Sequence, residues 1–385
     1  MRSVKSCEII ACAFAVCLAI ALLSLSIATG SKALGEEVIE SFTIGHDGDG
    51  VFLPVQIAGT THFFILDTGC TRTVIDKSLI DLEPDESTWL RAPSGPVKVA
   101  VAAAPEARIG KEELRATVRR VVCADLTSFR EAWDERLYGL LGMDFLSNKV
   151  VRIDFDRGVC ELLGDLGTVP EEPIRFKLGE FQQPQIKIEN VWRSPKVFTI
   201  DTGASGDGIL KSYLAKQRIA NGSARDVGSA LFQDLNKIES KSMVQLDELP
   251  IGGHLAKGPV FSTAVFDENR IGMQLLSRFV VTFDFPKKSL YLRPTNRLNE
   301  PESIDRSGLH IIRRDGIVVV DTVDAMSPAA EADIRPGDTI SEIAGVQVAG
   351  ERLVRLRRLL RQQDANVLIV GRRGEEILRL SMHLK

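Results

Sequence analysis

Alternation of apolar and polar positions runs through most of the chain and predicts a protein built mainly from β-strands. Short apolar runs are separated by Gly, Pro, Asn and Asp, a pattern typical of strands joined by tight turns. Residues 52–57 and 62–66 form two such runs on either side of Gly59, and residues 185–188 and 196–200 form a second pair. Each pair predicts a β-hairpin whose second strand ends at an aspartate.

Both predicted hairpins end in the same triplet, Asp-Thr-Gly, at residues 67–69 and 201–203. The similarity continues downstream, because a segment ending in Gly142 follows the first aspartate by 75 residues and one ending in Gly272 follows the second by 71. Each of these glycines is followed by further apolar runs with matching spacing. The shared spacing indicates that one unit was duplicated within the chain.

The segments between the repeated motifs predict further elements. Residues 97–103 and 114–122 are rich in Val and Ala and predict strands, and residues 128–136 predict a short helix. Pro, Ser and Gly punctuate residues 83–96, and the polar residues 220–242 stand at the corresponding place in the second half. These two intervals are therefore counterparts in the duplicated unit.

The N-terminal segment predicts a targeting sequence rather than part of the fold. Arg2 and Lys5 precede an uncharged run over residues 9–28, and residues 31–33 offer a small-x-small cleavage site. The run is longer than most signal-peptide cores and nearly long enough to span a bilayer, so residues 1–33 are interpreted as a cleaved signal peptide or a retained membrane anchor. In both cases the rest of the chain is expected to be exported, to the periplasm or the cell envelope.

Composition mainly excludes certain classes of function. Apolar residues make up 44% and charged residues 26% of the chain, as in an ordinary folded protein. The net charge of −4 argues against a nucleic-acid partner, and 5 His, 3 Trp and 3 Tyr offer little for a metal site or a base-stacking platform. We therefore predict no metal, no cofactor and no nucleic acid.

Cysteine usage gives no disulfide framework. Beyond the N-terminal segment the chain has Cys70, Cys123 and Cys160, an odd number. The last two could form one disulfide in the first half. Cys70 is interpreted as a small buried apolar residue rather than a redox group.

At the repeated triplets the chain resembles aspartic proteases of the pepsin and retropepsin class. In that family each lobe supplies one aspartate from an apolar-Asp-Thr-Gly loop, beside which a downstream apolar-apolar-Gly strand threads. Residues 66–69 with 140–142 match the first lobe, and residues 200–203 with 270–272 match the second. In the second match Arg270 stands where an apolar residue is usual.

The resemblance implies a mostly β, bilobal, pseudo-two-fold acid-protease β-barrel fold. It divides the chain into a first lobe over residues 34–165, a second lobe over residues 166–293 and a polar linker over residues 294–303. Because both lobes lie in one chain, the active site is expected to be complete in a monomer. Residues 83–96 would form the flap that closes over substrate, although this segment has Trp89 and no Tyr.

The resemblance also implies roles for residues of both triplets. Asp67 and Asp201 would be the catalytic pair, which shares one proton because two adjacent carboxylates do not both ionise. The ionised member would take a proton from water while the protonated member hydrogen-bonds the substrate carbonyl. The supporting residues are two threonines that would bond across the lobes, two glycines that allow tight turns, and two hydroxyls that would bond the outer carboxylate oxygens: Thr68 and Thr202, Gly69 and Gly203, Thr71 and Ser205.

These roles predict an exported aspartic endopeptidase that hydrolyses peptide bonds in protein or peptide substrates. The alternative is a non-catalytic peptide-binding protein that keeps a degenerate protease scaffold. Intact hydroxyl residues at Thr71 and Ser205 favour the enzyme, while the flap segment without a tyrosine favours the binding protein.

The C-terminal residues 304–385 resemble a PDZ domain. Residues 327–340 match its Ser-Pro-Ala and Gly-Asp core, and residues 317–323 predict the preceding strand. The resemblance implies an α+β module that captures peptide C-termini, with the peptide added as a strand to the sheet edge. Residues 351–362 predict the helix beside that groove, and its five arginines predict a solvated basic face more readily than a contact with an anionic membrane. The backbone expected to receive the peptide carboxylate is that of Gly308, Leu309, His310 and Ile311.

Overall fold

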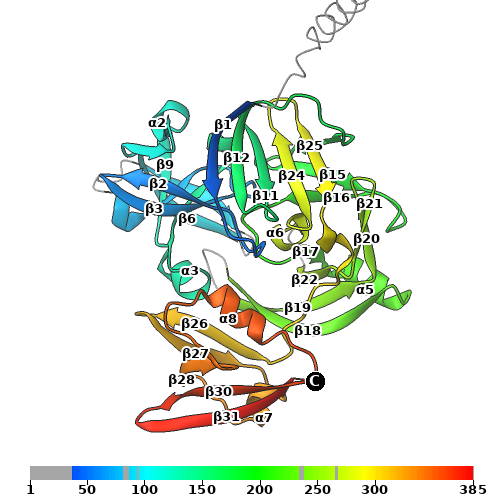
Figure 1. The fold of residues 1–385 in the computed structure, drawn as a ribbon. Helices are drawn as coiled ribbons and strands as arrows, with labels where there is room; N and C mark the ends of the chain where they lie inside the picture. Colours follow the sequence, from blue (N-terminus) through cyan, green and yellow to red (C-terminus); the bar gives the residue numbers. More distant parts are fainter. Residues whose placement is uncertain (1–36, 81–85, 93–94, 234–237, 265–267, 385) are drawn as a thin grey trace, which may run out of the picture.

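Two β lobes followed by a smaller C-terminal domain make up the part of the chain that the computed structural model describes, residues 37–80, 86–92, 95–233, 238–264 and 268–384 (Figure 1). The prediction of a mostly β, bilobal fold is confirmed. The predicted targeting segment, residues 1–33, lies outside these ranges. Within them, no helix has the length and apolar character needed to cross a membrane.

Lobe one is built on one nine-stranded sheet. Its elements are β2 (Phe52–Ile57), β3 (Thr60–Leu66), β4 (Val74–Asp76), η1 (Lys77–Leu79), β5 (Glu86–Ala92), β6 (Gly95–Ala103), β7 (Ala107–Ile109), β8 (Glu112–Glu113), α2 (Leu114–Thr117), β9 (Arg120–Ala124), α3 (Thr127–Ala132), β10 (Leu137–Leu141) and α4 (Met143–Leu146). Strand β10 lies between β3, to which it is parallel, and β4, to which it is antiparallel. Although β10 is far from β3 in the sequence, the two strands pair, and β3 is the strand that leads into Asp67.

Lobe two repeats this arrangement in an eight-stranded sheet. Its elements are β14 (Lys177–Leu178), β15 (Pro184–Ile188), β16 (Lys196–Ile200), β17 (Gly208–Lys211), α5 (Ser212–Ala220), β18 (Ala224–Gln233), β19 (Ile238–Leu246), β20 (Glu248–Ile251), β21 (His254–Lys257), β22 (Val260–Ala264), β23 (Asn269–Ile271) and α6 (Met273–Leu276). Strand β23 is parallel to β16 and antiparallel to β17, as β10 is to β3 and β4. The duplication inferred from the sequence is therefore visible in the topology.

A third sheet joins the two lobes. Lobe one contributes β1 (Glu37–Thr43), β11 (Val150–Asp154) and β12 (Val159–Asp165), and lobe two contributes β13 (Ile174–Arg175), β24 (Phe279–Asp284) and β25 (Ser289–Pro294). The order β1-β12-β11-β24-β25-β13 places β11 against β24 at the centre, and these strands are antiparallel. One buried apolar cluster includes Phe64 and Phe198 together with Phe283 of this sheet. The lobes thus share a core and a sheet, which fixes their relative positions.

Packing explains a glycine in the central strand of lobe one. A Cβ atom at Gly139 would lie 2.4 Å from Cε2 of Phe64, inside van der Waals contact. Phe64 is fully buried in the neighbouring strand. Any side chain at residue 139 would overlap the Phe64 ring, so this close pairing of β10 with β3 requires glycine there.

The segments taken as counterparts in the sequence are both hairpins. β5 and β6 form one hairpin in lobe one, and β18 and β19 form a longer one in lobe two. β6 then pairs with β9, and β19 pairs with β22. The β5–β6 hairpin contains much of the segment expected to form the flap, and Trp89 on β5 is 67% exposed.

Two sequence predictions in lobe one are wrong. The expected strand over residues 114–122 begins as α2, because Leu114 and Val118 are both buried four residues apart and the Val118 N–H donates to Leu114 O at 2.8 Å. The possible disulfide between Cys123 and Cys160 is absent, since both thiols are free and buried. Cys123 lies on β9 and Cys160 on β12, in different sheets.

The C-terminal domain has its own core. Its elements are β26 (Leu309–Arg314), β27 (Ile317–Val323), α7 (Pro328–Glu331), β28 (Thr339–Ile343), β29 (Val346–Gln347), α8 (Leu353–Leu359), β30 (Ala365–Arg373) and β31 (Glu376–Leu384). β26 is the edge strand of the sheet. Leu353, Leu356 and Leu360 of the predicted leucine stripe are buried in this core. The preceding segment, residues 294–303, contains η2 (Asn296–Asn299), whose Leu298 is buried against lobe two.

Arg352, at the start of α8, and Arg357 within it contact lobe one. Figure 1 shows α8 and β26 on the side of the C-terminal domain that faces the lobes. Arg352 forms ion pairs with Asp47 at 3.1 Å and with Asp134 at 2.9 Å, and Nη2 of Arg357 donates to Ala132 O at 2.6 Å. The prediction of a solvated basic face is therefore wrong, because much of its charge serves a contact within the chain.

We expect Arg352→Ala to lower the free energy of unfolding by about 1–2 kcal/mol, since Asp134 is 3% exposed and loses one of its cationic partners. Arg355→Ala is the matched control, because Arg355 pairs with Glu351 at the surface and should change stability by less than about 0.5 kcal/mol. Denaturant unfolding measures both values. Equal stability of the two variants would contradict docking through Arg352.

Candidate active site

Each repeated aspartate lies at the end of a buried strand and is held there by the strand beside it. The N–H of Asp67 donates to Leu141 O at 3.0 Å, and the N–H of Asp201 donates to Ile271 O at 2.9 Å. Both aspartates are buried, with 9% and 6% of their surface exposed. The two halves therefore position their carboxylates through the same backbone contact.

Reciprocal hydrogen bonds between the two threonines join the loops. The N–H of Thr68 donates to Oγ1 of Thr202 at 3.0 Å, and the N–H of Thr202 donates to Oγ1 of Thr68 at 3.1 Å. Each hydroxyl in turn donates to a carbonyl of the opposite lobe, Thr68 to Ile200 O and Thr202 to Leu66 O, both at 2.7 Å. Both side chains are fully buried, so the loops are held by hydrogen bonds that water does not reach.

The glycines of the two triplets each lie against the carboxylate of the opposite lobe. A Cβ at Gly69 would lie 2.3 Å from Oδ1 of Asp201, and a Cβ at Gly203 would lie 2.3 Å from Cγ of Asp67. Neither glycine has a left-handed backbone conformation. Close approach of the two loops, rather than the tight turn expected from the sequence, therefore requires glycine at both positions.

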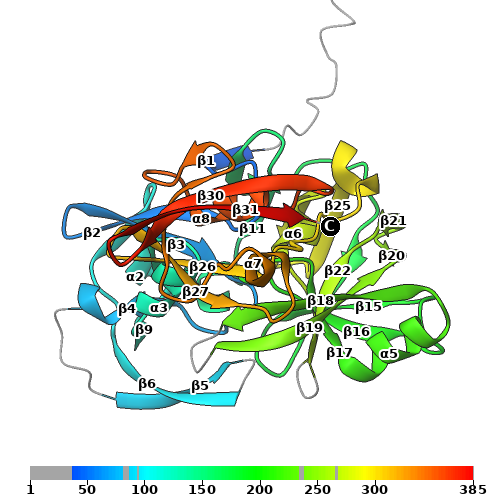
Figure 2. The same ribbon diagram turned by 90° about the horizontal axis from the view of Figure 1, so that it is seen from below.

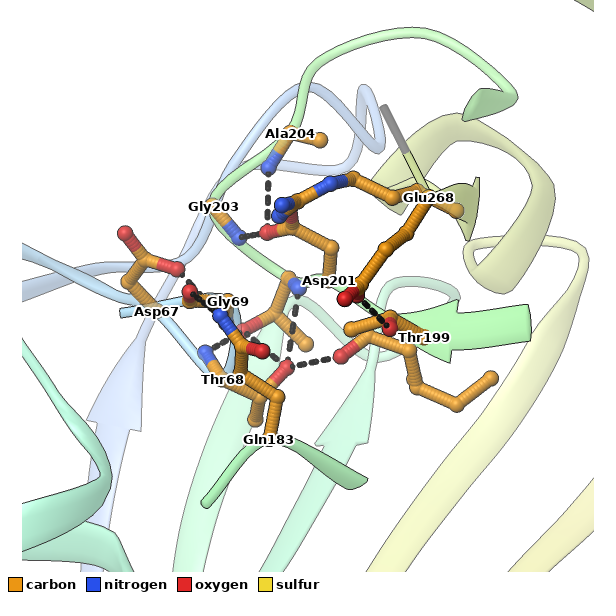
Figure 3. A network of polar contacts seen from close by, with 12 residues as sticks. Asp67, Thr68, Gly69, Gln183, Thr199, Asp201, Gly203, Ala204 and Glu268 are labelled. Carbon is orange, nitrogen blue, oxygen red and sulfur yellow. Dashed lines mark hydrogen bonds and ion pairs between the residues drawn. The ribbon is translucent and has the colours of Figure 1, made fainter. Parts of the chain in front are cut away.

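The two carboxylates have different hydrogen-bond partners. Oδ1 of Asp67 accepts from the N–H of Gly69 at 2.8 Å, and Oδ1 of Asp201 accepts from the N–H groups of Gly203 and Ala204, both at 3.1 Å (Figure 3). Oδ2 of Asp201 also forms a 2.7 Å ion pair with Nη1 of Arg270, and both side chains are less than 10% exposed. The pair is thus symmetric in its backbone contacts and asymmetric in its charge.

Electrostatics keep Asp67 protonated near neutral pH. Burial and the charge of Asp201 raise the pKa of Asp67 to about 8, against the opposing effects of the Gly69 N–H and the charge of Arg270. Burial and the charge of Asp67 also raise the pKa of the Cys70 thiol well above its ordinary value. Cys70 is therefore a neutral thiol, and its Sγ donates to Arg72 O at 3.0 Å.

The two hydroxyl residues expected to bond the outer carboxylate oxygens do something else. Oγ1 of Thr71 donates to Phe181 O at 2.7 Å, which ties the first loop to lobe two. Ser205 is exposed, and the side chain that bonds the outer oxygen of Asp201 is Arg270. The expectation is wrong because the Thr71 hydroxyl binds the turn before β15 rather than a carboxylate. At Asp201, Arg270 of β23 makes the contact that was expected from Ser205.

Three polar residues beside the pair had no assigned role in the sequence. Nε2 of Gln183 donates to Gly69 O at 2.6 Å, and Oγ1 of Thr199 donates to Oε2 of Glu268 at 2.9 Å. Figure 3 shows Glu268 and Thr199 on the side of Asp201 away from Asp67. None of the three is marked by a sequence pattern, whereas nearby Arg270 is, because it interrupts the apolar run before Gly272. In the described ranges no group of three or more His, Cys, Asp or Glu side chains is arranged to hold a metal ion.

The predicted carboxylate-binding loop of the C-terminal domain leads into the edge strand. Gly308 has φ of 65°, and a Cβ there would lie 2.3 Å from Cβ of Ser327. The N–H of Leu309 donates to Oγ of Ser307 at 3.0 Å, and Nε2 of His310 lies 3.1 Å from Oδ1 of Asp324. These local contacts order the loop before any ligand arrives.

Lobe one covers part of the strand to which a peptide would add. Helix α3 packs against β26, and Nη2 of Arg357 donates both to Ile311 O at 2.7 Å and to Ala132 O of lobe one. In Figure 2 α3 lies beside β26 and β27. The carbonyl of Ile311 is therefore already occupied, and an added peptide strand has to displace this contact.

Comparisons with known proteins agree with this architecture. The aspartyl protease family matches residues 53–145, and the PDZ domain family matches residues 319–373. A search of curated proteins found no match. Among solved structures, the aspartic proteinase from Irpex lacteus is 14% identical with a TM-score of 0.44, over 67% of this chain and 97% of that one. The resemblance to the aspartic proteases is confirmed by the family match over residues 53–145, and the resemblance of the C-terminal domain to a PDZ domain is confirmed by the match over residues 319–373.

Proposed function

We propose that the protein is an aspartic endopeptidase in which Asp67 and Asp201 activate water for peptide hydrolysis. The observation that carries the proposal is the buried carboxylate pair, held by reciprocal threonine bonds and by glycines that admit each opposite carboxylate. Such a pair retains one proton in the working pH range, because burial and mutual repulsion disfavour the doubly ionised state. It thereby offers a base and an acid in one place.

The reaction follows from those two protonation states. The ionised carboxylate removes a proton from water as the oxygen attacks the scissile carbonyl carbon, and the protonated carboxyl donates its proton to the carbonyl oxygen. The resulting tetrahedral diol collapses when the amide nitrogen gains a proton and the C–N bond breaks. Both carboxyl groups then hold one proton between them again, so the cycle consumes only water.

Several surrounding residues are proposed to keep this geometry fixed. Thr68 and Thr202 hold the loops, while Thr71 and Gln183 bond backbone carbonyls across the lobe boundary. All of them belong to one chain, which supports a site complete in a monomer. Rigid placement of the reacting groups is a large part of catalysis by such sites.

The PDZ domain is proposed to capture peptides or proteins, including peptide C-termini at Gly308 to Ile311. Its edge strand β26 is the element to which a peptide would add. The uncharged run over residues 9–28 supports a protein exported to the periplasm or cell envelope, with that run removed or retained as an anchor. Substrates would then be exported or envelope proteins.

A non-catalytic peptide-binding protein remains the competing hypothesis, and Arg270 is the observation that favours it. A cation bound to one member of the pair departs from the pattern of the family that the sequence resembles. The same guanidinium lies 2.7 Å from Oδ2 of Asp201, where it compensates the negative charge that a general base carries. Measured cleavage decides between the two hypotheses.

We expect Asp67→Asn and Asp201→Asn each to reduce cleavage of an unfolded protein such as casein by about 100-fold or more. Each variant removes either the acid or the base, so neither retains the shared proton. Asp364→Asn, a change at an exposed aspartate of the PDZ domain, is the control and should keep wild-type activity. Cleavage products are followed by mass spectrometry from acidic to alkaline pH. Full activity in both active-site variants, or none in the folded wild type, would favour the binding protein.

Stability should depend on pH through Asp67. Because its folded pKa of about 8 lies above the ordinary value of 3.8, the folded protein keeps a proton that the unfolded chain releases. This contribution to stability is complete below about pH 3.8 and is lost as the pH rises through about 8. Relative to Asp67→Asn, the wild type should lose up to about 1.4 kcal/mol per pH unit across this range. Denaturant unfolding at several pH values tests it, and parallel curves would contradict a buried protonated Asp67.

Release of the PDZ edge strand should improve peptide binding. Arg357→Ala frees the carbonyl of Ile311 from its guanidinium bond, so we expect about tenfold tighter binding of fluorescent peptides with free C-termini. Arg361→Ala is the matched control, because Arg361 lies in the turn just after α8 and pairs with Glu302. Fluorescence anisotropy gives both affinities, and unchanged binding in Arg357→Ala would show that the contact does not restrict the groove.

A further inference from the structure

We propose that Arg270 is a positioning residue that fixes the negative charge of the catalytic pair on Asp201 and leaves the shared proton on Asp67. The proposal rests on the proposed peptide hydrolysis and assigns the two roles within it. Asp201 becomes the base that receives the proton of water. Asp67 becomes the acid that protonates the substrate carbonyl.

The ion pair is part of the rigid centre of lobe two. Nη1 of Arg270 lies 2.7 Å from Oδ2 of Asp201, and the two side chains are 8% and 9% exposed. Arg270 is held by β23, where it pairs with Thr199 on one side and with Ile209 on the other. A guanidinium anchored in the middle of a sheet does not need to be ordered before it acts on the carboxylate.

The equivalent position in lobe one carries no charge. Leu140 stands two residues before Gly142, as Arg270 stands two residues before Gly272, and it pairs with Ile65 in β3. Arg270 therefore forms its ion pair with Asp201, and the equivalent position of lobe one provides no such cation for Asp67. Since two adjacent carboxylates hold one proton between them, a cation on one member removes the equivalence of the two microstates.

Other titratable groups lie around the pair. Asp67 is the nearest like charge, and its proton removes that repulsion. The Cys70 thiol faces both carboxylates and is neutral, because burial raises its pKa. Asp144 lies in α4, where it accepts from the N–H and hydroxyl of Thr73. Glu268 is the remaining anion on this side, and it accepts a hydrogen bond from Thr199.

The assignment has a consequence for the pH dependence of catalysis. Catalysis needs an ionised base, and the positive charge of Arg270 beside Asp201 favours that form, so the acidic limb of the pH profile depends on this ion pair. Activity at high pH is lost when Asp67 gives up its proton, and the pKa of Asp67 is about 8. The enzyme should therefore work over a broad range that extends to neutral pH.

The first test measures kcat/KM against pH for wild type, Arg270→Leu, Arg270→Lys and Arg218→Leu. Arg270→Leu copies the residue of lobe one, and the acidic limb should move upward by about one pH unit or more. Arg270→Lys keeps the charge and should move the limb much less. Arg218→Leu removes a lobe-two arginine whose guanidinium bonds Val191 O, and its profile should match wild type. An acidic limb that stays in place in Arg270→Leu while activity falls at every pH would overturn the proposal.

A second test reads the proton directly and does not depend on activity. Carbon-13 NMR of carboxyl-labelled aspartate at pH 6, assigned with Asp67→Asn and Asp201→Asn, should show Asp67 protonated and Asp201 ionised. In Arg270→Leu, or in Arg270→Gln if the leucine variant does not fold, the two signals should become similar. A protonated Asp201 in the wild type would overturn the assignment. The predicted signals without any proteolysis would instead refute the proposed endopeptidase and leave the charge assignment standing.

Discussion

Two buried carboxylates held against each other are the constraint on which the structure depends. Burial of such groups is unfavourable unless hydrogen bonds and charge compensation offset it, and repulsion would separate two free loops. The reciprocal bonds between Thr68 and Thr202 resist that separation. These bonds require that both loops stay in position. Strands β10 and β23 hold the two loops, and the shared central sheet holds the two lobes together.

Duplication explains why the two lobes share a strand arrangement, whereas the residues beside the two aspartates differ between the halves. Thr73 accepts the N–H of Gly142 in the first loop, whereas the backbone carbonyl of Asp207 accepts the N–H of Gly272 in the second. Burial raises the pKa of the Asp207 side chain to about 7, and Arg278 lies 3.3 Å from it. From there, ion pairs continue through Glu302 to Arg361, next to α8 of the PDZ domain. Ion pairs therefore link the segment after the second loop to the C-terminal domain.

The sequence predicted those features that follow from local repetition. Both hairpins, both aspartates and the strands after Gly142 and Gly272 repeat in order, so the bilobal framework could be inferred. Contacts between residues that are far apart in the sequence could not be predicted from it. The partner of Thr71 is a backbone carbonyl of lobe two, and the partners of Arg352 lie about 300 and 200 residues away in the chain. No periodicity or spacing encodes such pairs.

A residue that breaks a local rule was the most informative signal in the chain. Burial of the Arg270 charge in β23 carries a desolvation cost, which the uncharged Leu140 at the equivalent position of lobe one avoids. The ion pair with Asp201 offsets this cost. Arginine stays charged at every pH at which the protein folds. With Asp67 protonated and Asp201 ionised, the two carboxyl groups and Arg270 together carry no net charge. Neutrality makes the singly protonated pair the least costly state to bury, and that is also the state in which one carboxyl is an acid and the other a base.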